Sequence, residues 1–252
     1  MISKLGILDY GVGGLSVWRE IYTKRPDWPM LYLAHNAGVP FGLLDSKQFQ
    51  ECLEAIAPFF LAQQAVEVFV ACNAASTAIA GASQIFGGVR YVSMAPYVLQ
   101  ALQVQKAGKI GILGGERTIA SQVYEKPLRE QGAECWGLAT QVLSAYVEDG
   151  QISGESIESY LANILQTQHD VDVLLLACTH YPALIPVLQK IKPHWKIVDP
   201  AKTVAENFVW SESKSKTSLV CKTEFWTSGD LEKTARASKQ GFGVDVQWQA
   251  LQ

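Results

Sequence analysis

The chain has 252 residues, of which 48% are hydrophobic and 18% are charged, and its formal net charge is −3. This balance supports a hydrophobic core and excludes a disordered chain. Because the sequence has no cluster of lysine and arginine and no apolar run of about 18 residues, it predicts neither a nucleic-acid partner nor a membrane partner. The five cysteines are widely spaced without a CxxC pair, so we expect no disulfide framework or structural zinc site. We also expect the protein to be cytoplasmic.

In chain order, short apolar runs bounded by glycine, asparagine or proline alternate with longer segments in which apolar residues recur with a period of about 3.6. The apolar runs predict strands at 4–8, 30–33, 66–71, 89–92, 109–113, 171–177, 195–198 and 219–227. The periodic segments predict helices at 15–22, 48–64, 74–81, 119–131, 157–167, 183–191 and 230–240. Continuous apolar strands need helices on both faces, so the predicted fold class is α/β with parallel sheets.

The sequence also contains an internal repeat. KLGIL at 4–8 recurs as KIGIL at 109–113, and the cysteines that end VEVFVAC and VDVLLLAC are separated by nearly the same number of residues. The repeat predicts two pseudo-symmetric α/β halves, and the segment after the polar stretch WSESKSKT is expected to return to the first of them. The predicted halves are 1–94 plus 208–252, and 95–207.

Three residues with reactive or charged side chains stand at predicted strand ends, where parallel sheets bind their ligands. Asp9 follows the first strand and precedes GVGG, Cys72 lies between a strand and a helix, and Cys178 does the same in the second half. Free backbone N–H groups at a helix start stabilise a thiolate and can hold a carboxylate. If a pseudo-two-fold axis relates the halves, the two thiols face each other across the cleft. That arrangement suits the removal of a proton from one face of a stereocentre and the return of another to the opposite face.

These features also have plainer interpretations. A free cysteine usually behaves as a small buried hydrophobe, and we interpret Cys52, Cys135 and Cys221 in that way. GVGG lacks the third glycine of a dinucleotide loop and the sequence has no Walker lysine pattern, so no nucleotide is predicted. Cys178 and His180 have the chemistry of metal ligands, but no second Cys/His cluster in the sequence completes such a site.

Several segments resemble the glutamate racemase family of the cofactor-independent aspartate/glutamate racemases: LGILDYGVGGLSV, VPFG, ACNAAST, ACTHYP and FWTSGD…GFG. The resemblance covers essentially the whole chain. It implies racemisation of a small acidic amino acid by two bases, without PLP, another cofactor or a metal. It also implies a homodimer in which each chain has its site between its own two halves. Cys72 and Cys178 are then the bases. Asp9 assists Cys72, His180 assists Cys178, and Glu148, whose turn-like context alone suggests a solvated residue, orients the histidine.

The resemblance further implies substrate contacts, and several of them depart from the family pattern. Tyr10 stands where serine is usual, Phe41 where tyrosine is usual and Ala74 where threonine is usual, while HNAG replaces the usual DTAR. One methylene is worth only about 1–3 kcal/mol in a pocket, so a few changes can reverse a substrate preference. The bulk of Tyr10 is also expected to narrow the pocket. We therefore expect aspartate as the substrate, with a glutamate racemase supplying D-glutamate for peptidoglycan as the alternative. The implied contacts are Tyr10, Pro40, Phe41, Gly42, Asn73, Ala74, Thr118 and Thr179.

Two other functions stay open at this point. A relative acting on another carbon acid, such as a hydantoin racemase or an arylmalonate-type decarboxylase, belongs to the same superfamily, although a decarboxylase needs only one cysteine. A catalytically silent protein that senses an amino acid would bind its ligand without exchanging the α-proton. The presence of both cysteines together with Asp9 and His180 favours a racemase over either alternative.

Overall fold

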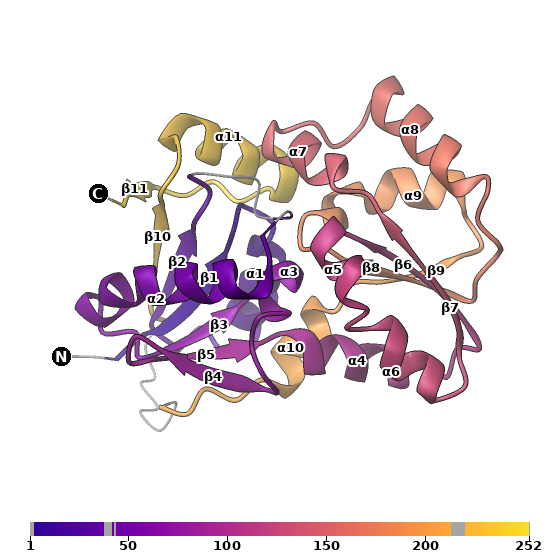
Figure 1. Cartoon of the computed structure of the whole chain (residues 1–252). Coiled ribbons are helices and arrows are strands. Elements are labelled where there is room, and N and C mark those ends of the chain that lie inside the picture. The colour runs from indigo at the N-terminus through magenta and orange to yellow at the C-terminus, as the bar shows by residue number, and fades with distance from the viewer. Residues whose placement is uncertain (1–2, 38–41, 43, 213–219, 252) are drawn as a thin grey trace.

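Two β-sheets lie side by side in the computed structural model, which describes residues 3–37, 42, 44–212 and 220–251 (Figure 1). The first sheet has the strand order β11-β10-β2-β1-β3-β5-β4, and the second has the order β7-β6-β8-β9. Among the described strands, every pairing is parallel except that of β4 with β5. The predicted α/β class with parallel sheets is confirmed.

The central strands are continuous apolar runs, and every residue of β1, β2, β3 and β8 is buried. Such strands are stable only when helices cover both faces of their sheet. The first sheet consists of β1 (Leu5–Asp9), β2 (Met30–Ala34), β3 (Glu67–Val70), β4 (Ser83–Phe86), β5 (Val89–Ser93), β10 (Thr223–Thr227) and β11 (Trp248–Ala250). The second consists of β6 (Lys109–Gly114), β7 (Glu134–Ala139), β8 (Val173–Ala177) and β9 (Lys196–Val198).

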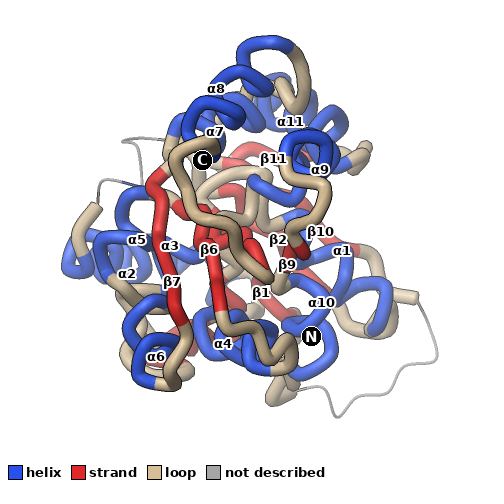
Figure 2. The backbone as a smooth tube through the Cα atoms, turned by 90° about the vertical axis from the view of Figure 1, so that its right-hand side faces the viewer, coloured by secondary structure: helices blue, strands red, loops and turns tan. Residues whose placement is uncertain are grey.

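Helices surround the strands on all sides in the end-on view of Figure 2. Around the first sheet lie α1 (Leu15–Lys24), α2 (Ser46–Ala62), α3 (Asn73–Ser76) and α11 (Leu231–Phe242). The remaining helices are α4 (Ala95–Gln103), α5 (Glu116–Ser121), α6 (Glu125–Glu130), α7 (Val142–Glu148), α8 (Glu155–Leu165), α9 (Ile185–Ile191) and α10 (Ala201–Asn207), with a 3-10 turn, η2, at Tyr181–Leu184.

Several predicted elements differ from the observed ones. The helix predicted at 74–81 is the single turn α3, and the helix predicted at 119–131 is two short helices, α5 and α6. The break falls at Gln122, whose φ of 53° lies in the left-handed region and ends α5. The strands β4, β7 and β11 and the helices α4, α7 and α10 were not predicted. Residue 219, where a strand was expected to begin, lies outside the described residues, and β10 starts at Thr223.

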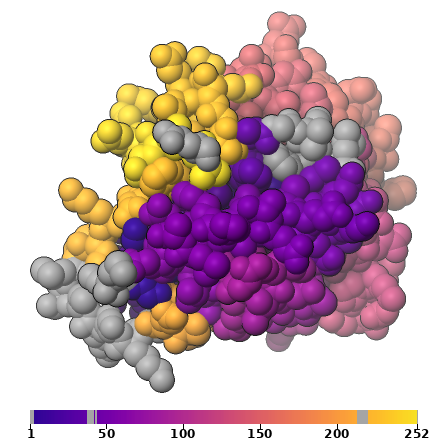
Figure 3. Space-filling model, turned by 60° about the vertical axis from the view of Figure 1, so that its left-hand side comes forward, coloured from indigo at the N-terminus to yellow at the C-terminus, as the bar shows by residue number. Residues whose placement is uncertain are grey.

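The C-terminal segment joins the first sheet. Strand β10 pairs with β2, with Thr223 opposite Met30, and β11 extends the sheet beyond β10. Figure 3 shows the yellow C-terminal residues packed on the indigo and purple N-terminal part. Helix α11 follows β10 and begins at Asp230, whose carboxylate caps the helix by accepting the N–H of Lys233. The predicted halves, 1–94 plus 208–252 and 95–207, stay a prediction.

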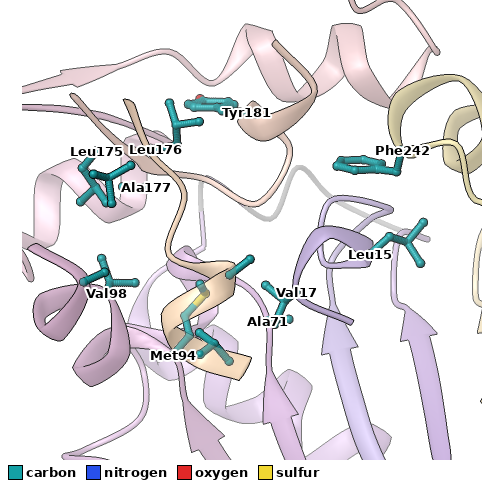
Figure 4. Close-up of a cluster of buried hydrophobic side chains, with 14 of the residues drawn as sticks. Leu15, Val17, Ala71, Met94, Val98, Leu175, Leu176, Ala177, Tyr181 and Phe242 are labelled. Carbon is teal, nitrogen blue, oxygen red and sulfur yellow. The ribbon is translucent and has the colours of Figure 1, made fainter. Parts of the chain in front are cut away.

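One hydrophobic cluster runs through both sheets and the space between them. It contains Ile7 of β1 and Leu175 of β8, and it includes Val98 of α4. In Figure 4, Ala71 and Met94 lie on one side of the close-up and Leu175, with its neighbours on β8, lies on the other. Because this shared core fixes the two sheets against each other, side chains at their facing strand ends have defined positions. Of the helices in the described ranges, none is both long and apolar enough to cross a membrane.

Candidate active site

The carboxyl ends of β1, β3, β6 and β8 meet at one cavity of about 350 Å³. This volume is within the usual range for small-molecule sites. Each predicted site residue that the structure describes lines it, whereas Pro40 and Phe41 lie outside the described residues. The predicted residues along the cavity are Asp9, Tyr10, Gly42, Cys72, Asn73, Ala74, Thr118, Glu148, Cys178, Thr179 and His180.

Cys72 stands between β3 and α3, and it is the N-cap residue of that short helix. The backbone N–H groups of Ala74 and Ala75 are directed towards its sulfur and favour the thiolate. Burial, with the nearby Asp9 carboxylate as the next cause, outweighs them and raises the pKa of the Cys72 thiol well above its ordinary value. The helix start thus acts in the expected direction, but the net shift is upward, which favours the protonated thiol at Cys72.

Asp9 is buried at the end of β1, next to Cys72. Its Oδ2 accepts the N–H of Gly14 at 2.6 Å, and the hydroxyl of Thr179 lies 3.3 Å from the same oxygen. Burial raises the pKa of the Asp9 carboxyl to about 6, although His180 and the Gly14 N–H act in the opposite direction. Thr179 thus contacts Asp9 across the cavity, from the other sheet, in addition to lining the space where a ligand would sit.

His180 connects Cys178 with Glu148 and with the first sheet. Its Nε2 lies 2.6 Å from Glu148 Oε1 and its Nδ1 lies 3.7 Å from Cys178 Sγ. Glu148 Oε1 also accepts the N–H of Val12 at 2.7 Å. Burial alone would lower the pKa of His180, but the bonds to Cys178 and Glu148 outweigh it and hold that pKa well above its ordinary value. Glu148 is therefore a half-buried partner of a histidine cation and not a solvated turn residue.

The side chain of Glu148 is itself held as a carboxylate. Burial raises its pKa, but the hydrogen bond and charge of His180 and the Val12 N–H outweigh burial, so the pKa is below its ordinary value. A cation 3.7 Å from the Cys178 sulfur stabilises a negative charge there. The two cysteines therefore have unequal surroundings, with a buried carboxylate beside Cys72 and a histidine cation beside Cys178.

The glycines of GVGG allow the pair His180–Glu148 to lie close to the backbone that follows β1. Replacement of Gly11 by alanine is expected to lower the turnover about 100-fold and to destabilise the fold by about 1–3 kcal/mol. The added Cβ would lie 2.2 Å from Glu148 Oε1 and 2.7 Å from His180 Nε2, so the pair would have to move. Steady-state kinetics and thermal unfolding measure the two effects. Gly108→Ala is the matched control, because its Cβ would meet no atom of the described residues closer than 3.7 Å. Equal turnover in the two variants would show that the position of the pair does not matter.

Two polar groups of residues that line the cavity lack hydrogen-bond partners within the described ranges of the chain. They are Nδ2 of Asn73, at the start of α3, and Oγ1 of Thr118, on α5. Both residues are buried, with exposed fractions of 3% and 1%. A buried donor without a partner costs free energy, and a bound anionic group would satisfy both. This favours a carboxylate as the group that fits between them.

Tyr10 lies differently from the expectation that its bulk narrows the site. Its ring makes edge-to-face contacts with His35 and Phe49, and Tyr10 belongs to the hydrophobic cluster beneath the cavity wall. Only 8% of the residue is exposed. Most of the aromatic volume is therefore part of the core, and a smaller part faces the cavity.

Further cavity residues were not identified from the sequence. Some follow the ends of β2, β7 and β10 and the others lie on α7 and α11: Asn36, Gln141, Ser144, Gly229, Asp230, Lys233 and Thr234. The strands β7 and β11 and the helix α7 were not predicted, and the positions of Ser144, Lys233 and Thr234 depend on how α7 and α11 pack. The SGD sequence at 228–230 is the one sequence signal for these residues, and it marks the start of α11.

The fold and the site can now be compared with known proteins. A model of the Asp/Glu/Hydantoin racemase family matches residues 36–207. The glutamate racemase of Pseudomonas aeruginosa is 30% identical over 246 residues, which span 92% of this chain and 91% of that protein. The glutamate racemase of Gloeothece citriformis is 31% identical over 252 residues, spanning 96% of this chain and 89% of that protein.

Solved structures show the same similarity. Glutamate racemase isoform RacE1 from Bacillus anthracis has a TM-score of 0.81 at 25% identity, with 99% of this chain and 97% of that chain covered. The Campylobacter jejuni glutamate racemase also has a TM-score of 0.81, at 28% identity, covering 94% and 96%. The aspartate racemase of Picrophilus torridus, at 14% identity and a TM-score of 0.58 over 81% of this chain and 91% of that one, shares the fold alone.

By class, then, the protein is a racemase, an isomerase with an α/β fold. The chain belongs to the Asp/Glu/Hydantoin racemase family. The relatives are named glutamate racemase, and these comparisons do not support the expectation of aspartate that was based on Tyr10, Phe41 and Ala74. Within the described residues, no group of three or more His, Cys, Asp or Glu side chains is arranged to hold a metal ion.

Proposed function

We propose that this protein is a PLP-independent glutamate racemase that uses Cys72 and Cys178 as its two bases. The observation that supports the proposal best is their symmetry. Cys72 ends a strand of the first sheet, Cys178 ends the equivalent strand of the second, and both line one cavity. A planar carbanion between two such groups can be reprotonated on the face opposite to the one that lost its proton.

In one direction of the reaction Cys178, beside the cationic His180, takes the α-proton from one face, and the Cys72 thiol gives a proton to the other face. The reverse reaction exchanges these roles, and no net proton is consumed. As the bond to the α-proton breaks, negative charge spreads onto the substrate carboxylate, and Asn73 Nδ2 and Thr118 Oγ1 would stabilise it.

Glutamate is the better supported substrate for two reasons. The relatives that align over nine-tenths of the chain are named glutamate racemase. In addition, the Tyr10 ring packs against His35 and Phe49, so less of its bulk lies in the cavity than the aspartate interpretation assumes. Assembly as a homodimer, which the family resemblance implies, is part of the same proposal.

Proton NMR in deuterated water, with L-glutamate and L-aspartate supplied separately and no PLP added, tests the proposed function. Loss of the α-proton signal from glutamate together with formation of D-glutamate is the expected result. Exchange with aspartate alone would overturn the choice of substrate and restore the aspartate interpretation. Exchange with neither would contradict the proposal and indicate another carbon acid or a binding protein.

The charge of the cavity points to a residue for the side-chain carboxylate. In the described part of the chain, Lys233 on α11 is the only lysine or arginine among the residues lining the cavity, where Asp9, Glu148 and Asp230 are all acidic. Its Nζ lies 2.8 Å from Asp149 Oδ1, and about half of its side chain is exposed. A cation at this place would pair with the side-chain carboxylate of a substrate that has two carboxylates.

Lys233→Gln is therefore expected to raise KM for glutamate about fivefold with little change in kcat, since a partly exposed charge pair is worth about 1 kcal/mol. Steady-state kinetics at low and high salt measure the effect, which is expected to shrink as salt rises. Lys239→Gln is the matched control. Lys239 lies on the same helix and pairs with Asp245 at 2.7 Å, outside the cavity lining. Equal KM values for the two variants would show that Lys233 does not contact the substrate.

A further inference from the structure

A buried tyrosine reaches the cavity wall from the second sheet. Tyr124 lies between α5 and α6 and is completely buried. Its hydroxyl donates to Asn73 Oδ1 at 2.6 Å, and Asn73 is the first residue of α3, directly after Cys72. The bond therefore joins Asn73, beside the cavity, to the turn that separates α5 from α6.

This hydrogen bond determines which end of the Asn73 amide faces the cavity. An asparagine side chain has one acceptor end and one donor end, and the acceptor is engaged by Tyr124. The donor, Nδ2, is buried without a hydrogen-bond partner in the described part of the chain, and Asn73 lines the cavity. An amide in the opposite orientation would present its oxygen to a carboxylate, and the two groups would repel each other.

The C-terminal end of α3 is also held by a residue of the α5 region. Arg117 of α5 donates from Nε to Thr77 Oγ1 at 3.0 Å, and Thr77 is the C-cap residue of α3. A second nitrogen of the guanidinium donates to Ser46 at the start of α2. Helix α3 is thus fixed between two contacts from the α5 region, one at Asn73 and one at Thr77. Ser76 ties the helix to the first sheet as well, because its hydroxyl donates to the carbonyl oxygen of Val70 at 3.3 Å and accepts the N–H of Met94 at 3.1 Å.

We propose that Tyr124 is a positioning residue, which holds the Asn73 amide so that Nδ2 points at the carboxylate of the amino-acid substrate. The inference rests on the proposed function, because it assigns the anion to the substrate of that reaction. Burial, together with the nearby Cys72, raises the pKa of the Tyr124 phenol, so the hydroxyl stays a donor across the working pH range. Tyr124 acts only through Asn73 and touches no reacting atom.

Tyr124→Phe tests this role, since the variant keeps the ring and removes only the hydroxyl. We expect KM for both enantiomers of glutamate to rise about tenfold, as for the loss of a hydrogen bond to a charged group, with a smaller change in kcat. The effect is expected to depend on Asn73. In an Asn73→Ala background, adding Tyr124→Phe is expected to change KM less than twofold, because there is then no amide to orient.

Tyr91→Phe is the control for stability. The Tyr91 hydroxyl is also buried and donates to the carbonyl oxygen of Leu53 at 2.8 Å, and neither residue lines the cavity. It is expected to lower the melting temperature as much as Tyr124→Phe without changing KM. Equal KM values in the two phenylalanine variants, or a tenfold rise that persists without Asn73, would overturn the positioning role. A wild-type protein that exchanges no α-proton of glutamate would instead overturn the proposed function itself.

Discussion

Serine in place of Cys72 or of Cys178 is expected to lower racemisation of glutamate at least about 1,000-fold in each variant. A hydroxyl is a far weaker acid than a thiol, so serine can neither hold the charge of the base nor supply the proton at a comparable rate. Because the two residues act on opposite faces of one carbon, neither can replace the other. The measurement is the rate of D-glutamate formation from L-glutamate, and of the reverse reaction, for each variant.

Cys135→Ser is the matched control for these variants. Cys135 lies on β7, where its sulfur contacts the carbonyl oxygen of Glu125, and it does not line the cavity. Activity close to that of the wild type is expected, because a hydroxyl can make the same contact. If either cavity cysteine could be replaced without loss, the two-base mechanism would be wrong. If only one were needed, a one-base reaction such as a decarboxylation would be favoured.

The second largest effect is expected for Glu148→Gln. Without the carboxylate 2.6 Å from its Nε2, His180 loses a partner that raises its pKa, so the imidazole becomes neutral at a lower pH than in the wild type. The cation beside Cys178 is then missing. We expect kcat/KM to fall about 100-fold near pH 8 and about tenfold near pH 6, where the remaining protonation of His180 compensates in part. A pH–rate profile from pH 6 to 9 measures both values.

The same substitution has a predictable effect on stability. The folded-state pKa of His180 is above its unfolded value of 6.5, so the stabilisation from its pairing is fully present below that pH. It is lost as the pH rises through the raised pKa. Because Glu148 must also be a carboxylate, the variant is expected to lose most stability from about pH 5 to neutrality and least at high pH. Glu158→Gln, which removes the exposed pair with Lys190, is the control, and a pH-independent loss in Glu148→Gln would contradict this account.

The strands that form the two sheets were predictable because of how completely they are buried. Residues 4–8, 109–113 and 171–177 are nearly pure apolar runs, and each corresponds to a central parallel strand. The edge strand β4 was missed because its polar sequence SQIF pairs on one side only. The break between α5 and α6 was also missed. The helical periodicity of the sequence continues through Gln122, so nothing local indicates a break there. The bond from Tyr124 to Asn73 joins the two halves of the fold and cannot be inferred from the local sequence.

For the site, strand ends and the family resemblance located the residues whose positions are local. Asp9 is the last residue of β1, Cys178 directly follows β8 and Cys72 stands two residues after β3. Their place at the cavity therefore follows from the topology of a parallel sheet. Lys233 and Tyr124 could not be found in this way, because each reaches the cavity through packing between distant segments. The raised pKa of Cys72 could not be predicted either, since it depends on the burial of the thiol and of its neighbour Asp9.

The pairing of β10 with β2 has a consequence for how the chain folds during its synthesis. Strands β1, β2 and β3 are translated early, but the neighbour of β2 on its outer side is made only after the whole second sheet. On the ribosome the second sheet can complete its pairing while β2 still has an open edge, which is a site for aggregation. Since Lys233 follows β10, the nascent chain also cannot assemble the complete cavity until that late strand has docked.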